Sequence, residues 1–459
     1  MRRDAGRRLG LLLSALTGIA VVVAGCADEA PGACDPRELA CRELIAAEIL
    51  RVRGGPPVTL PPVEVVTEDE LRARLEQDAV SLTPEEAALF EKWGRGLMLL
   101  RLVSSPDAVT RGSIDDFVMS VWGYYDRETG QITLIERPQS ADPDTATWLF
   151  AHELTHHAQA LDLQAGFATQ AGLNGSIDTQ DALSHHSEGE AVVVSELVRA
   201  ELRGSRFGFE DARTYFARWL LATQQEVADS RDPYLVVRAR MKYPVGGAYL
   251  SEVRFDHGND ALRTQWVPPV STTASWMRGY EAVEEVEALE DCELPITPTS
   301  YMGIVDERLG GELLFAMLIP EGVRDEASLA RSWAAATHWR SDHVRVFVDV
   351  TVPPASAPVA VAYRVRLDSE DAAAEVEALF DDSLGNAGTV SRMARDVLVL
   401  LAEDPAVWSS PAFPSCDQTL RRASSATRMP PVPGLPAVDV TWRPSASSSV
   451  SPDVSSAAE

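Results

Sequence analysis

The spacing of apolar and polar residues along the chain predicts several helices. Residues 35–52 repeat apolar side chains at helical spacing, and capping-box patterns at Thr67 and Thr83 begin two further helices. The run Trp148–Ala160 has strongly apolar flanks, so we expect a helix that is buried inside a domain. Another apolar helix is expected to begin near Glu188.

Other stretches alternate with the two-residue period of strands. Residues 120–136 form a predicted hairpin around a polar turn, directly before the buried helix. Strands are also predicted nearer the C-terminus, at His343–Thr351, Val359–Arg366, Asp396–Leu401 and Val438–Trp442. Helices are expected among them at 312–319, 328–336 and 368–380. The combined pattern predicts the α+β class, with a small sheet or hairpin edge beside a mainly helical domain.

Pro- and Gly-rich breaks and changes of composition suggest five segments. The expected divisions are a leader at 1–25, a tether with a short helix at 26–61, a mainly helical domain at 62–280, a small C-terminal α+β domain at 281–423, and a Pro/Ser-rich disordered tail at 424–459.

The first 25 residues resemble an export signal, with four arginines followed by a short apolar run that ends in Ala24-Gly25-Cys26. This ending resembles the lipobox of bacterial lipoproteins, which implies that Cys26 is lipidated. The alternative is an ordinary signal peptide followed by an incidental cysteine. We therefore expect an exported lipoprotein at the periplasmic or outer-surface face of the cell envelope, which contacts the membrane through its N-terminal lipid alone.

Charge and cysteine content narrow the class of protein further. The formal charge is −28, and removal of residues 1–25, which carry four Arg and one Asp, would leave a mature chain near −31. This balance argues against nucleic acid as a partner. Four cysteines remain besides Cys26, and an even number in an exported chain predicts two disulfides. Three pairings are open, and we favour Cys34–Cys41 and Cys292–Cys416.

The buried helix carries the pattern H-E-x-x-H in His152, Glu153 and His156. Residues four apart lie on one helical face, so both imidazoles can bind one cation. Two histidine ligands and a carboxylate that deprotonates a metal-activated water are typical of zinc peptidases. We therefore predict one Zn²⁺, with Glu153 as the general base. The hairpin before this helix lies where such enzymes pair an extended peptide with a sheet edge, although a purely supporting hairpin fits the pattern equally well.

Zinc in catalytic sites usually has a third protein ligand. The segment Glu188-Gly-Glu-Ala191 resembles the E-G-x-A segment that supplies a glutamate ligand in gluzincin aminopeptidases, which implies Glu188. Glu190, His185 and His186 remain alternatives for the ligand. Glu190 could instead orient a ligand imidazole or be a solvated neighbour, and the two histidines could stabilise an oxyanion or lie on the surface. Tyr243 is a further oxyanion candidate, or a packed aromatic residue.

Residues 62–275 resemble a family of uncharacterised bacterial gluzincin-type metalloproteins, many of them secreted or lipid-anchored. The motifs that carry the resemblance are Gly123–Asp126, His152–Gln159, Glu188–Ala191, Tyr243–Gly247 and Pro269–Thr272. The chain departs from the family pattern at His157, which stands in place of Ala, and at the polar segment Ser184–Ser187. The resemblance implies a zincin-like metallopeptidase domain.

The leading hypothesis from the sequence is a zinc metallopeptidase that acts on a peptide or protein substrate. The alternative is a catalytically idle, metal-stabilised binding module at the cell envelope. Glu153 separates the two, because catalysis requires this carboxylate and metal-dependent folding does not.

Overall fold

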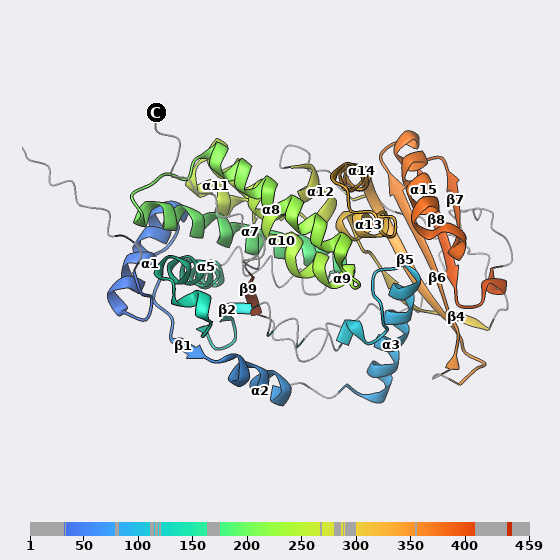
Figure 1. Ribbon diagram of the computed structural model, residues 1–459, viewed down its shortest axis with the longest axis horizontal. Coiled ribbons are helices and arrows are strands. Elements are labelled where there is room, and N and C mark those ends of the chain that lie inside the picture. The colour runs from blue at the N-terminus through green and yellow to red at the C-terminus, as the bar shows by residue number, and fades with distance from the viewer. Residues whose placement is uncertain are drawn as a thin grey trace, which may run out of the picture.

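The computed structural model has a mixed α+β fold with two small sheets (Figure 1). It describes residues 32, 34–78, 82–110, 114, 118, 121–162, 175–266, 269–279, 286–287, 289, 300–353, 356–408 and 438–442. The predicted leader, Cys26, Cys292, Cys416 and most of the predicted tail lie outside these residues. No helix in the described part of the chain is long and apolar enough to span a membrane.

The helices before residue 281 fill the left and centre of Figure 1, except that α3 lies beside the second sheet on the right. They are α1 (Leu39–Arg53), α2 (Glu68–Asp78), α3 (Pro84–Leu99), α5 (Pro143–Leu161), α7 (Ile177–Leu202), α8 (Phe209–Asp229), α9 (Pro233–Val236), α10 (Lys242–His257), α11 (Asn259–Thr264) and α12 (Thr273–Arg278). The C-terminal half adds α13 (Gly311–Met317), α14 (Glu326–Thr337) and α15 (Glu370–Leu384). The capping boxes predicted at Thr67 and Thr83 are both formed.

The first sheet has the strand order β1-β3-β2-β9, with bounds Val63–Val66, Gln131–Ile135, Val121–Asp126 and Val438–Trp442. The predicted hairpin is confirmed as the antiparallel pair β2–β3, and β1 pairs parallel with β3. The strand predicted at 438–442 is also confirmed, as β9, which pairs antiparallel with the outer edge of β2. Helix α5 packs against β2 so closely that a Cβ on Gly123 would lie 3.3 Å from Leu149 Cδ1.

Helices α7 and α10 cross at a pair of glycines. A Cβ on Gly189 of α7 would lie 2.3 Å from the backbone carbon of Gly246 on α10, so no larger residue fits at this crossing. The close approach brings the first residue of α10, Lys242, within reach of the side chain of Glu188.

The second sheet is antiparallel throughout and has the order β4-β5-β6-β8-β7, with bounds Tyr301–Glu307, Trp339–Asp349, Val359–Leu367, Asp396–Ala402 and Gly388–Met393. The β5–β6 hairpin and β8 were predicted, whereas β4 and β7 were not. Helix α3 packs on β5 and β6, and a Cβ on Gly96 would lie 2.9 Å from Val346. One set of buried apolar side chains therefore continues across residue 281, where a domain boundary was expected.

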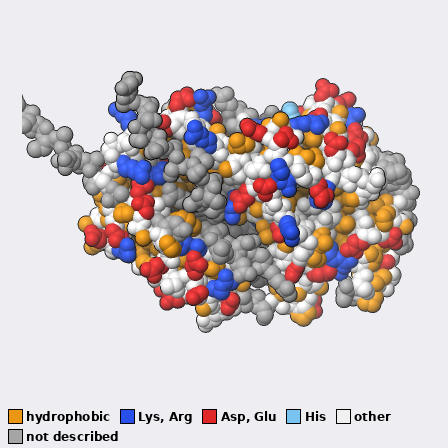
Figure 2. Space-filling model, in the orientation of Figure 1, with side chains coloured by type: hydrophobic (Ala, Val, Ile, Leu, Met, Phe, Trp, Pro, Cys, Tyr) orange, Lys and Arg blue, Asp and Glu red, His pale blue; other side chains and the backbone are white. Residues whose placement is uncertain are grey.

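Helix α1 differs from the tether expected at 26–61. Ile45 and Ile49 are fully buried, and α1 packs against both α5 and α7. A disulfide joins Cys34 to Cys41 at its start. Residues 39–53 are therefore part of the folded body. Figure 2 shows that acidic and basic side chains are interspersed on the outer surface in view, despite the strongly negative net charge.

Candidate metal centre

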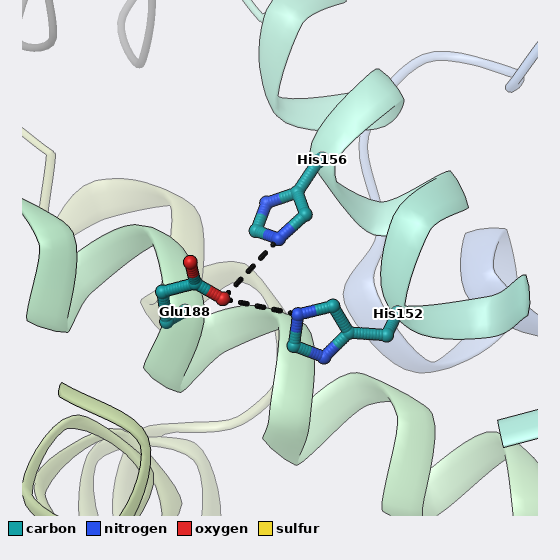
Figure 3. A group of neighbouring side chains, drawn as sticks. All are labelled: His152, His156 and Glu188. Atoms are coloured by element: carbon teal, nitrogen blue, oxygen red, sulfur yellow. Dashed lines mark hydrogen bonds and ion pairs between the residues drawn. The ribbon is translucent and has the colours of Figure 1, made fainter. Parts of the chain in front are cut away.

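Two imidazoles and one carboxylate meet between α5 and α7 (Figure 3). The Nε2 atom of His152 lies 3.1 Å from Oε2 of Glu188, and the Nε2 atom of His156 lies 3.4 Å from the same oxygen. The three ligand atoms all lie within 4.8 Å of one another, and all three side chains are buried. This buried triad could hold a metal ion.

Local sequence positions the two ligand helices. Asp142 accepts a hydrogen bond from the backbone N–H of Thr145 and caps α5, with Pro143 in the first turn. Ser176 caps α7 through the backbone N–H of Thr179. The helical spacing of four residues then places both α5 imidazoles on the side that faces α7. Long-range packing of the two helices supplies the third ligand.

Lys242 holds the other oxygen of Glu188. Its ammonium group donates to Oε1 at 3.0 Å, while Oε2 faces the two imidazoles. Burial acts to raise the pKa of Glu188, but Lys242 and the two histidines outweigh burial and hold the pKa well below its usual value. The carboxylate is therefore ionised, as a metal ligand must be.

A buried network fixes the orientation of His156. Its Nδ1 donates to Oε1 of Gln159 at 3.0 Å, which leaves Nε2 as the nitrogen that faces Glu188. Gln159 Nε2 donates in turn to Oε2 of Glu190 at 2.9 Å. Glu190 also accepts from Arg53 at 2.7 Å and from the Trp266 indole at 3.1 Å. The network thus connects α1 to a ligand on α5.

Glu190 therefore orients this network and lies outside the triad. This position matches its predicted alternative role, as a carboxylate that acts on a ligand imidazole through a neighbour. Glu153 is fully buried on α5, next to His152. His157 lies outside the triad, and its ring is in hydrogen-bond contact with the Tyr125 hydroxyl at 3.2 Å.

The two histidines on α7, His185 and His186, are not part of the triad. His185 pairs with buried Glu312 at 2.7 Å, and His186 stacks on Trp266 with ring centroids 3.8 Å apart. Burial lowers the pKa of His186 to about 4, so this ring is neutral at pH 7. The interpretation of both as surface residues is wrong, because His185 is 1% and His186 0% exposed.

Tyr243 is a buried aromatic residue beside the triad. Its ring lies parallel to that of Trp219, with an angle of 5° and centroids 5.8 Å apart. Its ring centroid is 6.2 Å from that of His152. This packing favours the packed aromatic alternative for Tyr243.

Sequence patterns missed Lys242 and Arg53. No pattern in the sequence pointed to Lys242. In the structure, a π-helical turn at Val237–Met241 comes directly before it. Such turns are frequent at functional sites because they shift side chains off the regular helical register. Arg53 carried no local signal, since its partner Glu190 is 137 residues away.

Gln159 gives a direct test of the network. We expect Gln159→Met, which keeps the volume and removes the amide, to weaken the affinity for a divalent metal ion by about 10- to 100-fold, as is typical for loss of a group that orients a ligand. The affinity is measured by competition with a chromophoric chelator. Gln224→Met, at a buried glutamine on α8, is the matched control. Equal affinities for both variants would show that Gln159 does not support His156.

The triad offers two imidazole nitrogens and one carboxylate oxygen, a set of donors that could hold a divalent metal ion. Comparison of the chain with known proteins found no matching family model, no matching curated protein and no matching solved structure.

Proposed function

We propose that this protein is a zinc-dependent metallopeptidase of gluzincin type, with a zincin-like arrangement of α5, α7 and the first sheet. The observation that carries the proposal is the convergence of His152 and His156 on one oxygen of Glu188. A fully buried carboxylate, Glu153, accompanies them on the same helix. Export as a lipid-anchored envelope protein, inferred from residues 1–26, is part of the same proposal.

His152, His156 and Glu188 would hold the ion. Zinc, when bound, supplies a Lewis acid that makes water nucleophilic at neutral pH and polarises a carbonyl group. Glu153 accepts the proton of the attacking water and then delivers it to the leaving amine. Lys242 keeps Glu188 ionised and fixes the oxygen that faces the ion. The substrate class is a peptide or protein.

Metal analysis of the purified mature chain tests this proposal. We expect one zinc per chain, and peptide cleavage that a chelator abolishes and added zinc restores. His156→Ala should lose the zinc and the cleavage. His338→Ala is the matched control, because this histidine lies 47% exposed on the surface and pairs with Asp368. A zinc-free chain that still cleaves peptides would overturn the proposal.

The alternative is a metal-stabilised binding module without catalysis. It predicts one zinc per chain, loss of stability in His156→Ala, and no cleavage of any peptide.

A further inference from the structure

The strand β9 forms one edge of the first sheet, next to β2. It pairs antiparallel with β2 in a register that runs from Asp126↔Val438 to Val121↔Trp442. It also contacts α5 and α7, the two helices that carry the triad (Figure 1). A segment from near the C-terminus therefore pairs with the backbone of β2 and contacts the helices that carry the ligands.

Extended peptides bind many proteins by adding a strand to a sheet edge, where main-chain hydrogen bonds provide affinity with little dependence on sequence. The outer edge of β2 offers such a row of backbone groups, and α5, with His152 and His156, packs against the same strand. The segment that pairs with this row is Val438-Asp-Val-Thr-Trp442, a short peptide in extended conformation.

We propose that β9 is an intramolecular substrate mimic, which a peptide must displace before it can pair with β2. This inference rests on the proposed peptidase function. It defines the ligand of this edge as an extended chain segment that runs antiparallel to β2. It also predicts a latent enzyme, whose own tail competes with substrate.

In competition for the edge of β2, β9 has a strong advantage over a free peptide. A segment tethered to its own binding site acts at an effective concentration of about millimolar. A free substrate at micromolar concentration is then excluded from β2 most of the time. Release of β9 therefore increases peptide binding and cleavage together.

Two adjacent prolines test the proposal in the full-length, zinc-loaded chain. Successive backbone N–H groups of a strand point in opposite directions, so D439P/V440P removes whichever of the two faces β2. D439A/V440A is the matched control, because it truncates the same side chains and keeps both donors. The probe is a fluorescent peptide with the sequence of residues 436–444.

We expect the proline variant to show at least ten-fold faster amide hydrogen exchange in β2, to bind the probe, and to cleave a reporter peptide at least ten-fold faster than the native chain. The probe should restore protection of β2 and inhibit the cleavage. The alanine variant should behave as the native chain does.

The outcomes separate this proposal from the proposed function. Faster exchange and probe binding without cleavage in any variant would leave β9 as the occupant of a peptide-binding edge and reject the peptidase. A proline variant that unfolds, or that exchanges faster without binding the probe, would show that β9 is a structural part of the sheet and overturn the inference.

Discussion

Glu153→Gln should reduce the rate of peptide cleavage by about 10²- to 10⁴-fold, the usual contribution of a general acid–base residue. The amide has nearly the shape of the carboxylate, but it cannot accept the proton of the attacking water or return it to the leaving amine. Glu153 is fully buried beside His152, and the triad does not include it. We therefore expect the variant to retain one zinc per chain and the thermal stability of the native protein.

Two further substitutions test whether the loss of cleavage activity is specific to the carboxylate of Glu153. Glu153→Asp keeps a carboxylate on a shorter side chain and should lose less activity than the amide variant. Glu196→Gln changes another buried glutamate of the ligand helices, which pairs with Arg199, and should cleave within a few-fold of the native rate. Cleavage by Glu153→Gln at the native rate would assign proton transfer to another group.

Local sequence patterns predicted the elements that are formed by contacts between residues close in sequence. The hairpin β2–β3 follows from alternation around a polar turn, and the helices after Thr67 and Thr83 follow from their capping boxes. The pair His152 and His156 was predictable because four residues span one helical turn. In each case, a few consecutive residues contain the information.

Features that depend on distant partners were not predictable in the same way. Strand β7, Gly388–Met393, has partly exposed side chains on both faces, so its alternation is weak. The strand β9 was recognised, but its partner β2 lies more than 300 residues earlier, and no local period specifies that pairing. Glu188 was chosen from its resemblance to a motif, and packing of α5 on α7 brings it to the imidazoles.

The role of Arg53 depends on such a distant partner. Arginine is rarely buried, so the sequence did not mark Arg53 as part of a core. In the structure, Arg53 is 1% exposed and Glu190 is 0% exposed, and they form an ion pair of 2.7 Å. Glu190 then binds Gln159, which binds His156. The helix α1 thereby supports a histidine of the candidate metal site.

Arg53→Met should destabilise the protein by about 3–5 kcal/mol, because it leaves the buried carboxylate of Glu190 without its cation. The free energy of unfolding from urea titration measures the effect. Arg51→Met is the matched control on the same helix. Its side chain is 51% exposed and pairs with Glu48 and Glu201, so we expect a loss of at most about 1 kcal/mol.

The double variant Arg53→Met/Glu190→Gln separates the buried charge from the lost packing. It removes the charge of Glu190 together with that of Arg53, while nearby Asp162 keeps its salt bridge with Arg263. The glutamine amide oxygen can still accept from Gln159 and Trp266. We expect it to recover much of the stability lost by Arg53→Met, since replacing both members of a buried ion pair costs far less than removing one. A double variant as unstable as the single would show that the arginine acts through packing, and that Glu190 tolerates burial through its remaining donors.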